Sequence, residues 1–96
     1  MPRLSMQVPH SLGREEAERR LTENLGKFRD QVTDLQEQWQ DHTLTFHFKA
    51  MGFPVGGTLA VEGALVKIDV DLPLAAMMIK GMIEQRLGQE ARAILA

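Results

Sequence analysis

The sequence predicts an α+β fold in which two helices cover one antiparallel sheet of five strands. Two observations support this prediction. Apolar and polar residues alternate from position 43 to position 72, interrupted only at short glycine-bearing segments, and a period of two marks strands with one buried and one solvent-facing side. On either side of this region, apolar residues recur at the three- and four-residue spacing of amphipathic helices.

The central region predicts three consecutive strands at residues 43–50, 55–62 and 65–72. Their inward-facing residues are Leu44, Phe46, Phe48, Val55, Leu59, Val61, Val66, Ile68, Val70 and Leu72. Short connections containing glycine make such strands neighbours in an antiparallel meander. Gly56 and Gly57 lie inside the middle strand, where glycine marks a bulge, a bend or a close backbone approach. We expect a bend that lets the sheet curl.

The N-terminal part predicts a strand at residues 3–8, ended by Pro9, and then a helix. Ser11 is the expected N-cap, and Glu15 and Glu16 suit the positive end of the helix dipole. The expected buried stripe of this helix consists of Ala17, Leu21, Leu25, Phe28 and Val32. The rest of its surface is polar.

Residues 35–40 predict an edge strand, because its glutamines and Glu37 discourage pairing with another chain. Asp41 and His42 then form a turn into the meander. Pro73 suits the first turn of a second helix, which we expect to continue unbroken to the C-terminus over roughly 33–36 Å.

The predicted order is therefore β-α-β-β-β-β-α. After one helical crossover, the first strand can pair antiparallel with the last, which gives the sheet order 2-3-4-5-1 with both helices on one face. This is a small helix-grip-like layout, in which a curved sheet wraps a C-terminal helix. The alternative is a flatter α+β sandwich with another strand order.

Composition limits the classes of function. The 96 residues form a single domain, 1–96, and their net charge of −2 with mixed signs gives no footprint for nucleic acid. The absence of cysteine excludes disulfides and thiolate chemistry. No apolar run approaches the ~20 residues that span a bilayer. We expect a cytoplasmic protein with no cofactor.

The start of the C-terminal helix is apolar almost all round, because Met77, Met78 and Met82 lie off its core stripe. One interpretation is a well-buried helix start in which methionine fills irregular gaps. The other is an adaptable apolar surface for a lipid-like ligand, a partner or a second copy of the chain. Phe53, beside a glycine and a proline, is expected to cap the core or to touch the same ligand.

Titratable residues give no catalytic or metal set. His42 and His47 lack a third ligand at a defined spacing, and His10 is expected at a structural junction between strand and helix. Asp69 and Asp71 lie ~6.5–7 Å apart on one strand face, with Lys67 beside them. We interpret them as part of a solvated face.

The segment 9–17, which contains His10, Ser11, Leu12 and Gly13, resembles the polyhydroxyalkanoic acid system family. Similarity continues at residues 57–59 and at 80–84, where Lys80 and Gly81 fall, although Ile79 stands where the family often has an aromatic residue. The family takes its name from association with polyhydroxyalkanoate storage genes. The resemblance implies a bacterial cytoplasmic protein that acts at polyester granules or their precursors, and it carries over no catalytic residue.

Three hypotheses follow. The first is a non-enzymatic accessory protein that offers Met77, Met78, Met82 and Phe53 to polymer, acyl chains or a partner protein. The second is a structural homodimer in which the apolar helix start is only the subunit interface. The third is an acyl-processing enzyme with His10 as its base.

Overall fold

The computed structural model describes residues 3–30, 32–50 and 52–96 and confirms the predicted sheet. Its elements are β1 (Arg3–Pro9), α1 (Arg14–Arg29), β2 (Thr33–Gln40), β3 (Thr43–Ala50), β4 (Phe53–Val61), β5 (Leu65–Asp71), the 3₁₀ helix η1 (Leu74–Ile79) and α2 (Lys80–Leu95). The strands are ordered β1-β5-β4-β3-β2, and every neighbouring pair is antiparallel. This is the predicted order 2-3-4-5-1 viewed from the other edge.

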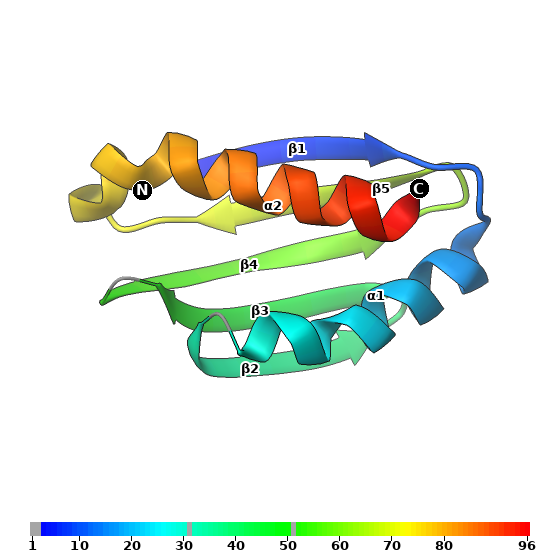
Figure 1. The fold of residues 1–96 in the computed structure, drawn as a ribbon, viewed down its shortest axis with the longest axis horizontal. Coiled ribbons are helices and arrows are strands. Elements are labelled where there is room, and N and C mark those ends of the chain that lie inside the picture. Colours follow the sequence, from blue (N-terminus) through cyan, green and yellow to red (C-terminus); the bar gives the residue numbers. More distant parts are fainter. Residues whose placement is uncertain (1–2, 31, 51) are drawn as a thin grey trace.

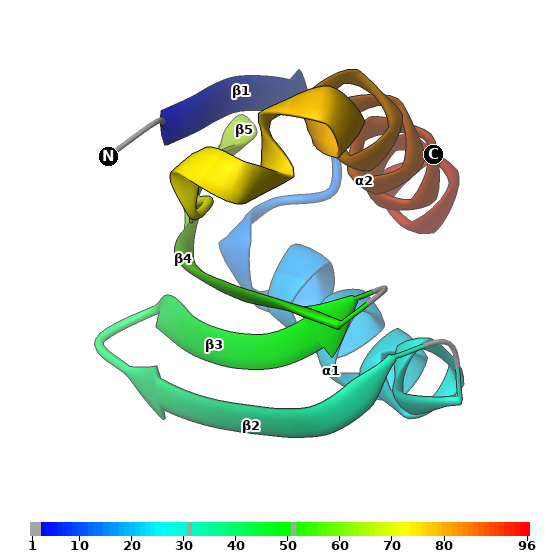
Figure 2. The same ribbon diagram turned by 90° about the vertical axis from the view of Figure 1, so that its left-hand side faces the viewer.

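The sheet curls, and α1 and α2 both lie on its concave side, as expected (Figure 2). In Figure 1, η1 lies at one end of the long axis, and the corner between β1 and α1 lies at the other. The comparison with a helix-grip layout stays a prediction.

The alternating apolar positions of the strands form the core. The most deeply buried large side chains are Leu44, Val55, Val66, Val70 and Leu72. Ala17 and Leu21 of α1 and Ile83, Ala91 and Leu95 of α2 complete it. Among the described residues, no methionine belongs to the buried core.

The predicted helical stripe of α1 is confirmed only in part. Ala17 and Leu21 are buried, whereas Val32 lies beyond the end of α1 and packs against the core from there. The side chains of Leu25 and Phe28 lie outside the part of the chain that is described.

The N-cap prediction at Ser11 was wrong. α1 begins at Arg14, and the Ala17 amide donates to the carbonyl of Gly13 over 3.1 Å. Gly13 has a φ of +82°, a left-handed conformation that glycine adopts without strain. Ser11 and Leu12 therefore lie in the turn that precedes α1 and not at its N-cap.

The prediction of one unbroken C-terminal helix was also wrong. Residues 74–79 form a 3₁₀ helix, and Ile79 (φ −106°, ψ 6°) departs from helical geometry just before α2. Three residues per turn place side chains at i and i+3 on one edge. Ala76 and Ile79 share the edge that faces the core, and the other two edges face solvent.

Gly57 marks a close approach between strands. A Cβ atom there would lie 2.1 Å from the Asp69 carbonyl oxygen and 3.0 Å from the Phe46 ring. At Gly56, a Cβ atom would lie 2.6 Å from Nδ1 of His47. The lack of a side chain at Gly57 thus allows the neighbouring strand β5 to come close, and the lack of one at Gly56 leaves room for the imidazole of His47.

Candidate functional site

Four apolar side chains form an exposed surface on η1 and the first turn of α2. Leu74 is 76% exposed, Met77 45%, Met78 97% and Met82 52%. We call Leu74, Met77, Met78 and Met82 the apolar patch. Sequence reasoning identified the three methionines and missed Leu74, because the one-helix prediction did not use the three-residue period that turns Leu74 outward together with Met77.

The apolar patch rests on a firmly packed base. Ala76 is fully buried, and Ile79 packs against the core, so η1 is anchored along one edge. Pro73 at its start has an extended conformation (φ −66°, ψ 153°), and no side chain caps the helix. The exposure of the apolar patch therefore follows from the geometry of η1 and not from a loose segment.

Phe53 lies apart from the exposed group. It opens β4, is half-buried and packs against the core, which is the first of the two roles that the sequence allowed. Its predicted part in ligand contact stays a prediction.

Lys80 and Gly81 begin α2, immediately beside the exposed methionines. Gly81 is exposed, and a Cβ atom there would meet nothing within 4 Å. The fold therefore gives no steric reason for glycine at this position, although glycine disfavours a helix by about 1 kcal/mol relative to alanine.

His10 is held in a hydrogen-bonded corner at the opposite end of the molecule. The Leu12 amide donates to Nδ1 of His10 over 3.2 Å, so Nδ1 is unprotonated, and Nε2 donates to the Glu62 carbonyl 3.1 Å away. The His10 amide also donates to the Ala64 carbonyl at 2.9 Å. The imidazole thus fastens the β1–α1 connection to the β4–β5 turn.

The residues after His10 complete this structure, which we call the polar corner (His10 to Arg14). Leu12 packs against the core, Gly13 supplies the left-handed turn, and Nε of Arg14 donates to the Val61 carbonyl over 3.2 Å. Ser11 is exposed. The segment that carries the resemblance thus connects β1 to α1 and helps to hold the fold together.

The C-terminal end of α2 is tied to α1 by Arg20. Its Nη1 donates to the carbonyl of Ala96 over 2.5 Å, and its Nε donates to Glu16 over 3.0 Å. Hydrogen bonds from Arg19 and Arg20 lower the pKa of Glu16 from 4.5 to about 2. A cation at the negative end of a helix dipole is stabilising, so this end of α2 is fixed while its other end carries the apolar patch.

The two neighbouring carboxylates of β5, Asp69 and Asp71, link this strand to β1. Asp69 accepts a 2.6 Å hydrogen bond from the Ser5 hydroxyl, and Asp71 accepts one of 3.0 Å from Nε of Arg3. Asp71 raises the pKa of that guanidinium.

His42 contacts Glu18 at 2.7 Å, and no group of three potential metal ligands occurs within the described ranges.

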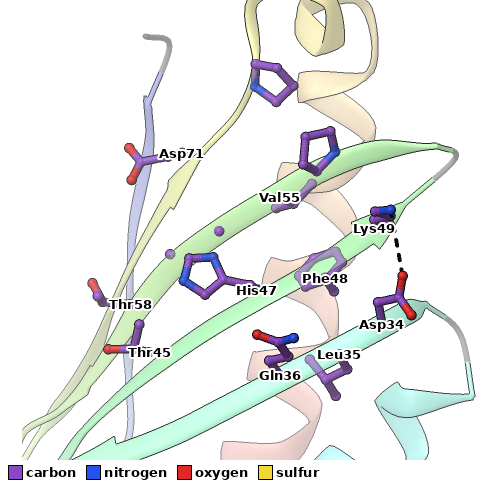
Figure 3. Close-up of a pocket in the computed structure, with 14 residues that line it drawn as sticks. Asp34, Leu35, Gln36, Thr45, His47, Phe48, Lys49, Val55, Thr58 and Asp71 are labelled. Carbon is purple, nitrogen blue, oxygen red and sulfur yellow. Dashed lines mark ion pairs between the residues drawn. The ribbon is translucent and has the colours of Figure 1, made fainter.

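The outer face of the sheet holds a hollow that sequence reasoning did not identify. It has a volume of about 940 Å³ and opens broadly to solvent. Figure 3 shows Gln36, Thr45, His47, Thr58 and Asp71 around it. Polar residues at alternate positions of adjacent strands were the available signal.

Charges at the rim of this hollow are matched. Lys49 lies 3.8 Å from Asp34 (Figure 3), and Asp71 pairs with Arg3. The hollow is lined by apolar residues such as Leu35, Val55 and Pro73 as well as by polar ones, and the charged residues at its rim are paired. Of the predicted solvated face, which comprised Lys67, Asp69 and Asp71, only Asp71 lines the hollow.

Together these features define a small α+β domain with an apolar patch at one end and a hydrogen-bonded polar corner at the other. The chain belongs to the family described as "putative polyhydroxyalkanoic acid system protein", whose sequence model matches residues 4–95. The predicted family is thus confirmed across almost the whole chain.

A solved structure titled "Crystal structure of TTHA0849", from Thermus thermophilus, is similar at 13% sequence identity and a TM-score of 0.47. The match covers 98% of this chain and 92% of that one. No curated protein matches the chain. Within the described part of the chain, no helix is both long and apolar enough to cross a membrane.

Proposed function

We propose that this protein is a non-enzymatic accessory protein of polyhydroxyalkanoate storage, which binds aliphatic polyester or acyl chains through the apolar patch. Its place would be the cytoplasm, at the surface of storage granules. The proposal rests on family membership together with one observation, the exposure of four large apolar side chains on a well-packed base.

The apolar patch has the right energetic scale for a reversible surface contact. Full burial of one Leu or Met side chain contributes about 1.5–3 kcal/mol, so the four together supply several kcal/mol before the cost of association. A polymer surface presents many equivalent chains, and weak contacts suffice when sites are repeated. Methionine suits such a surface because its flexible side chain adapts to an irregular partner.

The size of the apolar patch favours a chain-like ligand over a homodimer. Exposed apolar patches of a few hundred Å² often mark functional contacts, whereas a stable protein interface buries about 800 Å² on each partner. The apolar patch has only four side chains, on η1 and the first turn of α2. Its size is therefore closer to that of such a functional patch than to that of a stable protein interface. A dimer held by this surface alone would be weak.

The polar corner supports a non-enzymatic role. A general base needs a free lone pair within reach of a substrate proton. In His10, Nδ1 accepts from the Leu12 amide while Nε2 donates to the Glu62 carbonyl. The geometry therefore favours a structural role for the residue that the enzyme hypothesis requires.

The test is the affinity of purified protein for polyhydroxybutyrate particles. Replacing Met78 and Met82 together by Gln should weaken binding by about tenfold or more, because burying polar amides replaces a favourable contact with a desolvation cost. The matched control, Met78→Leu with Met82→Leu, keeps the apolar surface and should bind like the natural chain.

Equal affinity of the Gln and Leu variants would exclude these methionines from the contact. A solution mass twice that of the chain, lost in the Gln variant and accompanied by no particle binding, would favour the homodimer hypothesis instead.

A further inference from the structure

Sulfur in this chain occurs only in methionine: the sequence has six methionines and no cysteine. Methionine thioethers react with peroxides to give sulfoxides, and specific reductases reverse the reaction. Any two-electron oxidation of sulfur in this protein must therefore fall on methionine, and solvent access decides which of them reacts first.

The described methionines differ sharply in access. Met78 is 97% exposed, Met82 52% and Met77 45%. Met6, in contrast, is half-buried on β1, is paired across the sheet with Ile68 and packs against the core. Peroxide can thus reach the three sulfurs of the apolar patch more readily than that of Met6.

We propose that Met77, Met78 and Met82 form an oxidation site through which hydrogen peroxide makes the apolar patch more polar while the fold persists. In each reaction the sulfur lone pair attacks one peroxide oxygen and the O–O bond breaks. Sulfur is oxidised to the sulfoxide, and the other oxygen leaves as water after proton transfer. The oxidant is hydrogen peroxide supplied from solution.

The position of these residues explains why the fold survives oxidation. Ala76 and Ile79 anchor η1 on the opposite edge, and Ile83 continues that anchor into α2. No sulfur of the apolar patch belongs to the buried core. A sulfoxide at these positions meets water in the free protein, whereas in a complex with an aliphatic chain it would be a buried polar group without a partner.

The functional consequence, release from polyester, rests on the proposed function, whereas the oxidation itself does not. Two readouts separate them. Peptide mass spectrometry gives the order of oxidation, and retention on an octyl chromatography resin reports the apolar surface without any polyester. Binding to polyhydroxybutyrate particles is the third readout.

Among the four methionines that the structure describes, Met78 should oxidise first after treatment with hydrogen peroxide, Met82 and Met77 next, and Met6 last. Retention on the resin should fall, particle affinity should fall about tenfold or more, and the melting temperature should change little. The triple variant Met77→Leu, Met78→Leu, Met82→Leu is the matched control and should keep its retention and affinity under the same treatment.

Oxidation of Met6 as fast as Met78, or an equal loss of retention in the leucine variant, would overturn the inference. If neither the oxidised nor the untreated protein binds particles, the proposed function fails, and oxidation order and resin retention still decide the oxidation site. Incubation with methionine sulfoxide reductases should restore retention in the natural chain.

Discussion

At one end of the long axis, His10 and Arg14 of the polar corner make side-chain hydrogen bonds to the carbonyls of Glu62 and Val61. At the other end lie η1 and the first turn of α2 (Figure 1). They leave four apolar side chains in solvent. The two regions lie at either end of the C-terminal helical segment, whose far end Arg20 fixes to α1. One end completes the fold and the other is available for contact.

The segment that carries the family resemblance and the surface proposed for binding are therefore different regions of the chain. In the segment that carries the resemblance, His10 is held by hydrogen bonds and Gly13 supplies a left-handed turn, so both have a structural role. The apolar patch has no such account within the described structure. Substitutions in the polar corner should therefore change stability, and substitutions in the apolar patch should change binding.

The largest expected loss of stability comes from Gly57→Ala. The added Cβ would lie 2.1 Å from the Asp69 carbonyl oxygen, which belongs to a paired strand and cannot move freely. We expect a loss of about 3 kcal/mol or more in the free energy of unfolding, measured by urea denaturation. Gly63→Ala, where a Cβ meets nothing within 4 Å, is the control; similar losses in both variants would contradict the close approach.

His10→Ala should have the second largest effect, a loss of about 2–3 kcal/mol in the free energy of unfolding. The substitution leaves the Leu12 amide and the Glu62 carbonyl without their partner, and an unsatisfied partly buried group costs about 1–3 kcal/mol. His47→Ala, on the exposed outer face, should change the unfolding free energy by less than about 0.5 kcal/mol. A His10 variant of natural stability would remove the structural account of the polar corner.

Acid should weaken the link between the two helices at the end remote from the apolar patch. The pKa of Glu16 is about 2 in the fold, lowered by hydrogen bonds from Arg19 and Arg20, against 4.5 for the free group. Its stabilising contribution is therefore complete above about pH 4.5 and is lost as pH falls towards 2. Glu16 and Arg20 are half-exposed and Arg19 is exposed, so salt should reduce the effect.

Thermal unfolding of the natural chain and of Glu16→Gln between pH 6 and pH 2 measures this contribution. The difference between the two proteins should shrink as the medium becomes more acidic. A difference that stays constant with pH would show that Glu16 acts through something other than its charge.

The smallest expected change is a gain in the free energy of unfolding. Gly81→Ala adds a methyl group into open space in the first turn of α2, and alanine favours a helix by roughly 0.5–1 kcal/mol over glycine. Urea denaturation should show that gain. If particle affinity falls at the same time, Gly81 belongs to the contact surface; a loss of stability would mean that its backbone is not freely helical.

Most of the architecture could be predicted because strand periodicity is local. Leu44, Val66 and Leu72 occupy the buried face that a two-residue period assigns to them, and short connections then determine strand order. Local patterns could not predict the 3₁₀ geometry of η1, because it depends on how Ala76 and Ile79 meet the core after Pro73. The helix start at Arg14 likewise depends on the left-handed turn at Gly13.

The candidate site was predicted in part for the same reason. Residues off a core stripe can be read from helical spacing, which indicated the three methionines. The hydrogen bond from His10 to the Glu62 carbonyl joins residues 52 positions apart and has no signature along the chain. The outer-face hollow also arises only when β2 to β5 are placed side by side.

The most direct test of the division between the two ends is particle affinity, measured for two variants under conditions where both are folded. The double variant Met78→Gln, Met82→Gln should bind polyhydroxybutyrate particles at least about tenfold more weakly than the natural chain, and His10→Ala should bind with unchanged affinity. Weaker binding by the folded His10 variant, with full affinity in the methionine variant, would contradict the assignment of contact to the apolar patch.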